Sequence, residues 1–353
     1  MMTTLNKTTA LGQQIWLDFL SRTLIQKGEL KQLIDQGLSG ATTNPVILST
    51  VIKSGGQYTD SIFKLKSKGE NSKRIYERII TEDVQKACDE FNERYEKSQF
   101  DQGYVSVEVD PNYANDSNQT IIEGRRLFAN IARPNVMIKV PATKHGIQAA
   151  STLLKEGINI NLTLVFKSHL ESIYYMYQDA LQDRLNRNLP IDKIRAVISL
   201  FLSRIDTALD PTLPEKLQGK VALSMAKSAY QSWKKAFMHP KWKELEKNNA
   251  HPIDLLFAST SSKNDNYSPL HYISPLIGPH TINTLPPHTL NIFIEKGEPR
   301  LTLEEGVDEA KKVLAAVKEE GIDLETLASR LQEEGLKHFK EAFNDLLKML
   351  AQN

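Results

Sequence analysis

Short β-rich runs alternate with longer helical segments along most of this chain, and the alternation limits the folds open to it. Alternating strand and helix units predict a parallel sheet, and eight such units are what a closed (β/α)₈ barrel requires. An open doubly wound sheet is the alternative, but no glycine-rich phosphate loop follows an early strand. The eight candidate strands cover residues 14–19, 40–43, 104–110, 136–141, 159–166, 196–202, 253–260 and 281–285.

Two further amphipathic helices are predicted after Gly321, at the C-terminal end of the chain. Leucines at 324, 327 and 331 mark the first apolar stripe, and apolar residues between 336 and 350 mark the second. Apolar stripes with the helical period of about 3.6 residues most simply pack on the body of the barrel. The alternative is that one of these helices packs against a second copy of the chain at a dimer interface. We therefore expect one domain over residues 1–353, with C-terminal helices from about residue 321 packed on it. We expect a monomer or a homodimer.

The composition excludes several classes of partner. The 44 basic and 43 acidic residues nearly balance, which gives no sign of a nucleic-acid or acidic-membrane partner. Cys88 is the only cysteine, so an internal disulfide or a cysteine-based metal cluster is excluded. The first residues lack the apolar core of a signal peptide, and no run approaches the roughly 18 apolar residues that span a membrane. We expect a soluble cytoplasmic protein.

A single charged residue, Lys139, interrupts the apolar run at residues 136–143 (VMIKVPAT). Burying an unpaired ammonium group is so costly that such a group tends to lose its proton. A neutral lysine is a nucleophile that can attack a ketone and form a Schiff base. The alternative is an edge-strand lysine whose ammonium group reaches water.

Four consecutive candidate strands have one apolar face and one face rich in polar groups. Alternate residues of a strand face opposite sides, so the apolar faces can meet the helices while the polar faces converge inside the barrel. An inert barrel interior is filled by bulky branched side chains, so polar residues there favour a catalytic site over an inert hydrogen-bond network. The convergent residues are Glu108, Lys139, Asn161, Thr163 and Ser199, and Asp110 shares the face of Glu108.

Eight segments, in this order, resemble the transaldolases, the class I Schiff-base transferases of the pentose phosphate pathway. They cover nearly the whole predicted barrel, and their combination is highly specific. The last two resemble the longer transaldolases of actinobacteria and cyanobacteria more than the shorter enterobacterial ones. The segments are residues 16–18 (WLD), 41–45 (ATTNP), 105–111 (VSVEVDP), 138–143 (IKVPAT), 159–166 (NINLTLVF), 199–206 (SLFLSRID), 258–264 (ASTSSKN) and 278–286 (GPHTINTLP).

The resemblance implies four catalytic residues. Lys139 matches the Schiff-base lysine, and Asp18 matches the acid/base that takes the C4 hydroxyl proton during carbon–carbon cleavage. Glu108 and Thr163 match the pair that holds and activates the catalytic water. A retro-aldol step of this kind uses the protonated imine as its electron sink, so we expect no metal and no cofactor. The histidines are scattered, without the clustering that a zinc-dependent aldolase would need.

Six further residues are expected to bind the sugar phosphate. Asn44 and Asn161, with Ser199 beside them, correspond to residues that bind the dihydroxyacetone hydroxyls. We expect Arg204 to bind the phosphate through two N–H groups of its guanidinium. The alternative is that Arg204 forms an ion pair with Asp206 or Asp210 at the surface. The expected substrate-binding residues are Asn44, Asn161, Ser199, Arg204, Ser261 and Lys263.

Two residues depart from the longer branch of the family. Serine stands at 261, where glycine is usual, and phenylalanine stands at 257, where tryptophan is usual. Serine avoids a positive φ, so the first change bears on the backbone of its loop. The second bears on packing.

The expected activity is transfer of dihydroxyacetone from sedoheptulose 7-phosphate or fructose 6-phosphate to glyceraldehyde 3-phosphate or erythrose 4-phosphate. One alternative is a fructose 6-phosphate aldolase, which resembles a shorter chain with tyrosine near the water site; Glu108 and the C-terminal helices favour the transferase. The other alternative is a non-catalytic sugar-phosphate-binding barrel. Loss of Lys139, Glu108 or Asp18 would indicate that, and all three are present.

Overall fold

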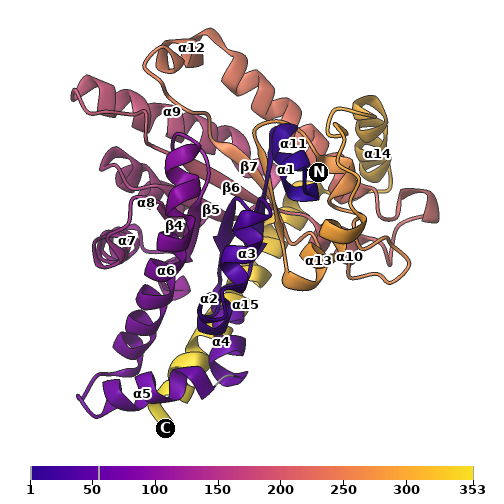
Figure 1. Cartoon of the computed structure of the whole chain (residues 1–353). Coiled ribbons are helices and arrows are strands. Elements are labelled where there is room, and N and C mark those ends of the chain that lie inside the picture. The colour runs from indigo at the N-terminus through magenta and orange to yellow at the C-terminus, as the bar shows by residue number, and fades with distance from the viewer. Residues whose placement is uncertain (1, 55, 353) are drawn as a thin grey trace.

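Eight parallel strands form a closed barrel at the centre of the molecule (Figure 1). The structure is a computed structural model, and it describes residues 2–54 and 56–352. Each strand pairs with the next along the chain, and the last pairs with the first, so the predicted (β/α)₈ barrel is confirmed. The strands are β1 (Gln13–Asp18), β2 (Gly40–Thr42), β3 (Tyr104–Glu108), β4 (Val136–Pro141), β5 (Ile160–Val165), β6 (Ala196–Phe201), β7 (Asp254–Ala258) and β8 (Thr281–Leu285).

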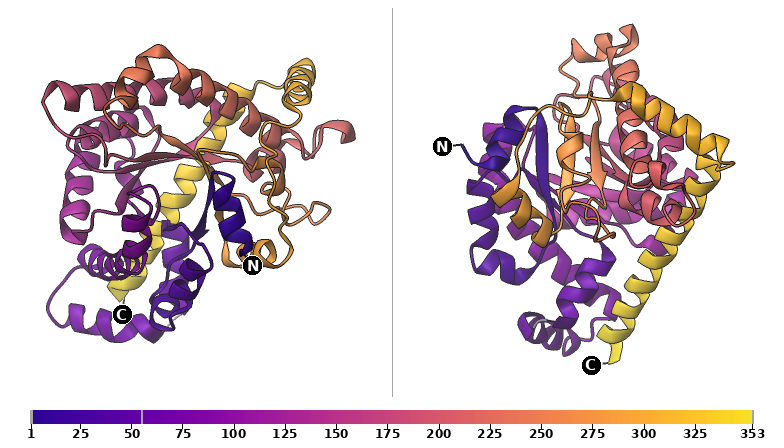
Figure 2. Two further views of the ribbon diagram at one scale, coloured as in Figure 1. Left: turned by 45° about the horizontal axis from the view of Figure 1, so that its top comes forward. Right: turned by 90° about the vertical axis from the view of Figure 1, so that its right-hand side faces the viewer.

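Helices surround the barrel and cover its outer face (Figures 1 and 2). They follow the strands in the alternating order that the sequence predicts. The α-helices are α1 (Thr4–Ala10), α2 (Arg22–Gln26), α3 (Glu29–Asp35), α4 (Pro45–Ser54), α5 (Thr59–Lys66), α6 (Ser72–Lys97), α7 (Ser117–Ile131), α8 (Lys144–Lys155), α9 (Leu170–Asn186), α10 (Ser203–Leu209), α11 (Val221–Met238), α12 (Pro240–Glu246), α13 (Pro287–Lys296), α14 (Val307–Glu319) and α15 (Leu324–Gln352). Short 3₁₀ turns are η1 (Gly56–Tyr58), η2 (Pro111–Tyr113), η3 (Lys167–His169), η4 (Glu215–Leu217) and η5 (Ser274–Leu276).

The apolar faces of the strands form the main core together with the helices. Val105, Ile138 and Leu162 belong to these faces, and all three are fully buried. Burying one such side chain stabilises the fold by about 1.5–3 kcal/mol. Because the apolar side chains of these strands pack against the helices, the alternate, polar side chains point into the barrel interior.

Strand β3 ends two residues earlier than predicted. Asp110 caps the start of the turn η2, and its Oδ1 accepts a hydrogen bond from the backbone N–H of Asn112 at 2.9 Å. Its Oδ2 accepts from Nζ of Lys73 on α6 at 2.7 Å. The prediction that Asp110 shares the inner face with Glu108 is wrong, because the chain turns out of the strand before it.

Strand β5 contains an irregularity at Leu164. The pairing of β5 with β6 shifts register between Leu162 and Val165, and Leu164 has a φ of 57°. A leucine in this left-handed region is unusual, and a bulge bends its strand and redirects a side chain. Thr163, a predicted catalytic residue, directly precedes the bulge.

The C-terminal segment is one continuous helix, α15, where the sequence predicts two (Figure 2, right). Gly335 separates the two predicted apolar stripes, but it does not adopt the positive φ with which glycine ends helices. The stripes therefore join into one buried face that packs against α4, α6 and β5.

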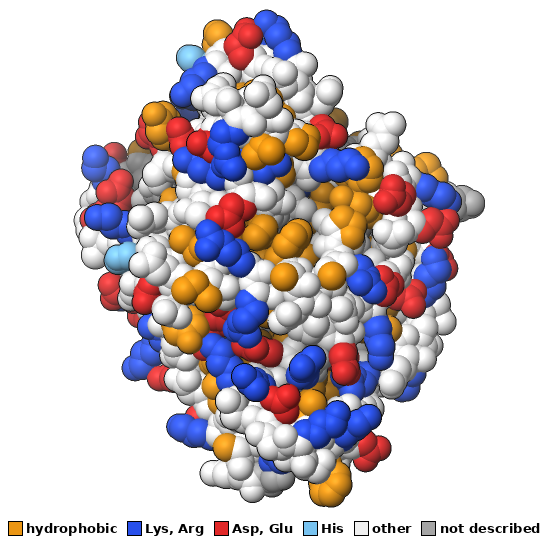
Figure 3. Space-filling model, turned by 90° about the vertical axis from the view of Figure 1, so that its left-hand side faces the viewer, with side chains coloured by type: hydrophobic (Ala, Val, Ile, Leu, Met, Phe, Trp, Pro, Cys, Tyr) orange, Lys and Arg blue, Asp and Glu red, His pale blue; other side chains and the backbone are white. Residues whose placement is uncertain are grey.

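The surface mixes charges of both signs. Figure 3 shows the left-hand side of Figure 1, where basic and acidic side chains alternate with no large area of one sign. Exposed ion pairs such as Lys155 with Asp179, at 3.0 Å, contribute about 0–1 kcal/mol each. In the described parts of the chain, no helix is long and apolar enough to cross a membrane.

Candidate active site

Three titratable side chains meet near the carboxyl ends of strands β1, β3 and β4. Asp18 is the last residue of β1, Glu108 is the last residue of β3, and Lys139 lies on β4 in register with Glu108. Nζ of Lys139 lies 3.5 Å from Oε2 of Glu108 and donates a hydrogen bond to the backbone oxygen of Thr43 at 3.2 Å. Only 5% of the Lys139 surface is exposed, so it is not an edge-strand lysine that reaches water.

Burial changes the acidity of both carboxyl groups. It raises the pKa of Asp18, although the positive charges of Lys139 and Lys263 oppose the rise. Burial also raises the pKa of Glu108 to about 7; Lys139 opposes this shift, and the negative charge of Asp18 adds to it. A pair of carboxyl groups with raised pKa values beside a buried lysine is typical of an active site.

Glu108 and Thr163 have side-chain oxygens that are buried without a hydrogen-bond partner within the described part of the chain. Thr163 is in register with Pro141, two residues beyond Lys139 on the neighbouring strand. A buried polar atom without a partner is costly, and such atoms gather at functional sites. Both groups are therefore free to bind a small polar molecule next to the lysine.

Asn161 is held in a chain of hydrogen bonds across three strands. Its Nδ2 donates to Oγ of Ser106 at 3.0 Å, and its Oδ1 accepts from Oγ of Ser199 at 2.7 Å. Asn161 is fully buried, while Ser199 lies on the wall of the adjacent cavity. Asn44 faces the same cavity, and its Oδ1 accepts from the backbone N–H groups of Val46 and Ile47 at the start of α4. Its amide NH₂ group is left to face a ligand.

A cavity of about 160 Å³ collects most of the predicted site residues. The structure brings Asp18, Lys139 and Thr163 together with Asn44 and Ser199, while Glu108 and Asn161 adjoin this group through Lys139 and Ser199. Its lining residues are Asp18, Thr42, Asn44, Lys139, Thr163, Ser199, Phe201, Arg204, Leu256, Ala258, Ser259, Ser261, Lys263, Thr284, Pro286 and Phe339.

Two basic side chains besides Lys139 line the cavity. The guanidinium carbon of Arg204 lies 5.3 Å from the ring centroid of Phe201, and no carboxylate in residues 2–54 or 56–352 forms an ion pair with it. Asp206 and Asp210 instead accept hydrogen bonds from Tyr272 and Tyr267, so the surface-pair alternative for Arg204 is wrong. Nζ of Lys263 donates to Oγ of Ser261 at 3.2 Å. Burial lowers the pKa of Arg204 from its usual value.

The two departures from the family pattern are accommodated. Ser261 lies outside the left-handed region, which Ser259 adopts instead with a φ of 55°. The loop therefore does not require glycine at 261. Phe257 is fully buried in β7, whose neighbouring residues Leu256 and Ala258 line the cavity.

Sequence reasoning missed several wall residues. Phe201 could have been found, since it shares the inner face of β6 with Ser199. Phe339 could not, because its place in the apolar stripe of α15 resembles that of any core residue. In this way α15 contributes directly to the cavity as well as bracing the barrel.

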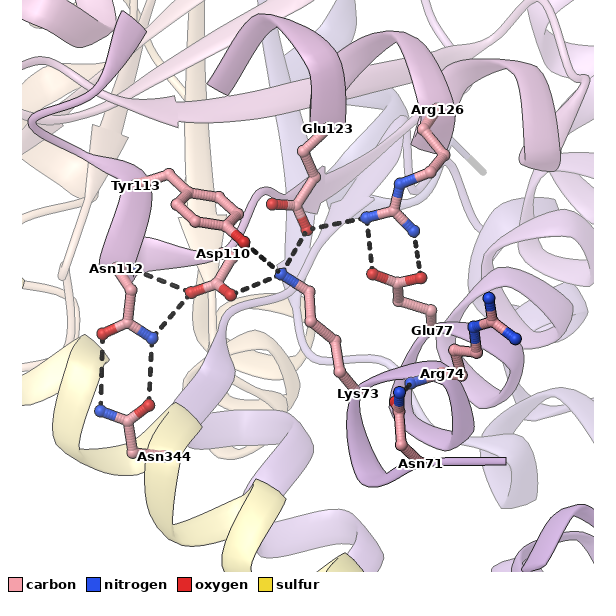
Figure 4. A network of polar contacts seen from close by, with 10 residues as sticks. All are labelled: Asn71, Lys73, Arg74, Glu77, Asp110, Asn112, Tyr113, Glu123, Arg126 and Asn344. Carbon is pink, nitrogen blue, oxygen red and sulfur yellow. Dashed lines mark hydrogen bonds and ion pairs between the residues drawn. The ribbon is translucent and has the colours of Figure 1, made fainter. Parts of the chain in front are cut away.

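A polar network, buried at Glu123 and exposed at Asn112, connects the end of β3 to α15 (Figure 4). Nζ of Lys73 contacts Asp110, Tyr113 and Glu123, and the last of these also faces Arg126 at 3.5 Å. Nδ2 of Asn112 donates to Oδ1 of Asn344 on α15 at 3.0 Å. The network therefore fixes α15 to the turn that follows Glu108.

A buried lysine beside one buried and one partly buried carboxyl group, at the carboxyl end of a (β/α)₈ barrel, defines a class of site suited to imine chemistry on a carbonyl substrate. In the described segments, no group of three or more His, Cys, Asp or Glu side chains could hold a metal ion.

Comparison with known proteins places the chain within this class. The family model described as Transaldolase/Fructose-6-phosphate aldolase matches residues 15–350, so the chain belongs to that family. A transaldolase of Neisseria gonorrhoeae is 46% identical over 347 residues, which cover 98% of this chain and 99% of that protein. A transaldolase of Thiobacillus denitrificans is 40% identical over 346 residues, 96% of each chain. The cyanobacterial Transaldolase 2 of Nostoc sp. is 39% identical over 360 residues, 96% of this chain and 94% of that protein.

These comparisons confirm the predicted family and the prediction that the chain is an enzyme of the transaldolase type, which acts on sugar phosphates. The likeness to the long cyanobacterial proteins agrees with the predicted branch.

Proposed function

We propose that this enzyme transfers a dihydroxyacetone unit from a ketose phosphate to an aldose phosphate through a Schiff base on Lys139. The donors are sedoheptulose 7-phosphate or fructose 6-phosphate, and the acceptors are glyceraldehyde 3-phosphate or erythrose 4-phosphate. The observation that carries the proposal is the buried Lys139 amine, 3.5 Å from Glu108, in one cavity with Asp18 and Arg204.

In the first step the neutral amine of Lys139 attacks the ketone carbon, and the carbonyl oxygen leaves as water. Glu108 lies 3.5 Å from the amine and carries a pKa of about 7, so it can exchange protons near neutral pH. Thr163 has a free hydroxyl in the same cavity and can hold the water that leaves here and returns when the imine is hydrolysed.

In the second step the protonated imine accepts the electron pair of the C3–C4 bond. Asp18 takes the proton of the C4 hydroxyl, and the aldose phosphate departs. The raised pKa of Asp18 makes it a better proton acceptor than an ordinary aspartate. The acceptor aldehyde then adds to the enamine by the reverse of these events, and Asp18 returns the proton.

The remaining wall residues bind the substrate. Asn44 and Ser199 offer an amide and a hydroxyl to the dihydroxyacetone hydroxyls, and Asn161 orients Ser199 through the 2.7 Å hydrogen bond. Arg204 and Lys263 bind the phosphate, with Ser261 beside them. A charge-assisted hydrogen bond to phosphate contributes about 1.5–3 kcal/mol.

The reaction serves the non-oxidative pentose phosphate pathway in the cytoplasm. We further propose that residues 1–353 work as one domain, in a monomer or a homodimer, because the apolar face of α15 completes the barrel core.

Borohydride trapping with fructose 6-phosphate tests the proposal. We expect a covalent dihydroxyacetone adduct on Lys139 and net turnover only when an aldose phosphate acceptor is present. Absence of an adduct would contradict the Schiff-base mechanism. Rapid release of free dihydroxyacetone without an acceptor would instead indicate the fructose 6-phosphate aldolase activity.

A further inference from the structure

Gly335 lies at the middle of helix α15, where a glycine is costly. Glycine inside a helix destabilises it relative to alanine, because the backbone loses more freedom on folding. Gly335 is buried and keeps helical geometry, so it neither ends the helix nor faces water. Its small size, rather than its flexibility, must be what this position uses.

Two side chains occupy the space that a larger residue would need. A Cβ atom on Gly335 would lie 2.8 Å from Cδ2 of Leu164 and 3.2 Å from Nη1 of Arg204. The first distance is shorter than normal carbon–carbon contact, and the second is tight. The backbone of α15 therefore lies directly against the guanidinium group that lines the catalytic cavity.

Packing, rather than an ion pair, holds Arg204. Its guanidinium lies against the ring of Phe201, and across residues 2–54 and 56–352 no carboxylate pairs with it. A long flexible side chain without such a partner keeps one orientation only if its neighbours leave no alternative rotamer. From α15, the backbone at Gly335 contacts the guanidinium directly, and the negative charge of Glu334 acts on it from beyond ion-pair distance.

Helix α15 is itself fixed at this point. Nε2 of Gln332 donates to the backbone oxygens of Ala142 and Leu164, both at 3.0 Å. These oxygens belong to the ends of β4 and β5, the strands that carry Lys139 and Thr163. One helical turn beyond Gly335, Phe339 enters the cavity wall. The helix cannot shift away from Arg204 without breaking these contacts.

We propose that Gly335 is a positioning residue that sets the orientation of Arg204, so that helix α15 governs recognition of the phosphate end of the substrate. The inference rests on the proposed role of Arg204 in binding phosphate. An added methyl group would displace the guanidinium and misalign its paired N–H groups, whose fixed geometry matches phosphate oxygens.

The variant Gly335→Ala tests this proposal. We expect the KM for a phosphorylated donor to rise about five- to tenfold, as a misaligned charge-assisted contact loses part of its roughly 1.5–3 kcal/mol. The KM for unphosphorylated fructose should change less than about twofold, because Lys139 and Asp18 are unaffected. The measured quantity is the ratio of the two KM values.

Gly124→Ala is the matched control. Gly124 lies inside helix α7, where a Cβ atom would come 2.8 Å from Cδ1 of Leu153, away from the cavity. The added Cβ atom lies 2.8 Å from a leucine methyl group in both variants, so the control reproduces the packing strain without a contact to Arg204. We expect its KM ratio to equal that of the wild type. An equal shift in both variants would overturn the proposal.

A double-mutant cycle with Arg204→Ala separates this proposal from the function it rests on. If Gly335 acts through Arg204, Gly335→Ala should have no further effect on the KM ratio in the Arg204→Ala background. A large effect of Arg204→Ala with none of Gly335→Ala overturns the positioning role alone. No effect of Arg204→Ala on the ratio overturns the phosphate role and, with it, the positioning role.

A second variant covers the case in which Gly335→Ala fails to fold. Combining Gly335→Ala with Leu164→Ala removes the side-chain end that lies 2.8 Å from the new methyl group and leaves the contact with Arg204. We expect the KM ratio of this pair to rise as for Gly335→Ala, compared with Leu164→Ala alone. An unchanged ratio would overturn the proposal.

Discussion

Lys139 can form a Schiff base only if its amine meets the substrate carbonyl in the neutral form. No other charged side chain can take its place. We expect Lys139→Arg to abolish turnover and borohydride trapping while the protein stays folded, because a guanidinium keeps its charge and cannot attack a carbonyl. Lys167 is the control, since it is half-buried at the end of the next strand, and Lys167→Arg should keep the adduct. Residual activity of Lys139→Arg above about one per cent would contradict the assignment.

Asp18 acts later, during carbon–carbon cleavage. Asp18→Asn should slow turnover by about 10²–10⁴-fold, the usual contribution of a general acid–base group. The imine with the intact ketose should still form and be trapped by borohydride, since this step depends on Lys139 and Glu108. Rapid-quench trapping of the six-carbon adduct checks both expectations together. A wild-type rate would show that Asp18 only maintains the structure.

The strand pattern was enough to find Lys139, Glu108, Thr163 and Ser199, because a two-residue period places alternate side chains in one interior. The positions of Asp18 and Arg204 needed the family resemblance, since each lies at or beyond a strand end, where the period carries no information. Phe339 and Gly335 escaped prediction because their roles depend on where a helix lies after folding. No local pattern specifies that position.

The network between α6, α7 and α15 contains a buried carboxyl group, that of Glu123, whose negative charge is only partly balanced by nearby positive charges. Glu123 is 4% exposed, and its Oε2 has no hydrogen-bond partner in the described part of the chain. Burial raises its pKa to about 7, against the opposing charges of Lys73 and Arg126. Asp110 and Glu77 add to the rise. The contacts between α6, α7 and α15 shown in Figure 4 are therefore destabilised when Glu123 is ionised.

The raised pKa of Glu123 fixes the sign of a pH effect on stability. As the pH rises from about 4.5 to about 7, the unfolded chain loses the proton while the folded protein keeps it, so this group's contribution to stability falls. Glu123→Gln does not titrate. The wild type therefore loses stability relative to this variant as the pH rises. The difference in free energy of unfolding, variant minus wild type, should increase by on the order of 1–3 kcal/mol between about pH 5 and about pH 8.

Urea unfolding of both proteins at the two pH values measures this difference. Glu171→Gln, an exposed change on α9, should differ from the wild type by less than about 0.5 kcal/mol at both. A Glu123→Gln difference that does not vary with pH would show that the carboxyl group is already ionised in the folded state at low pH.

The strands were placed within two residues by their sequence, because turn residues and β-branched runs mark their limits closely. The error at α15 has a physical reason. Glycine usually ends a helix, but at Gly335 the contact with Leu164 and Arg204 favours a continuous helix with no side chain at that position. Tertiary packing therefore overrides the local preference.

At the scale of the whole molecule, the formal net charge is only +1, and the face in Figure 3 mixes both signs. Such a surface has little long-range field with which to attract an anionic sugar phosphate. We expect kcat/KM to fall less than about threefold between about 20 mM and about 200 mM salt, over which the Debye length shortens from about 20 Å to about 7 Å. Steady-state kinetics over a sodium chloride series measures this. A fall of more than tenfold would indicate electrostatic steering.

The pairing of β1 with β8 has a consequence for how the protein is made. Gln13 donates to Thr281 across 268 residues, so the barrel cannot close until β8 has left the ribosome. At about 5–20 residues per second, β1 waits on the order of tens of seconds for its second neighbour. During that time its open edge is a template for pairing with other chains. Helix α15 is made after all eight strands, so each newly made molecule acquires a complete catalytic cavity only after the strands of the barrel have been synthesised.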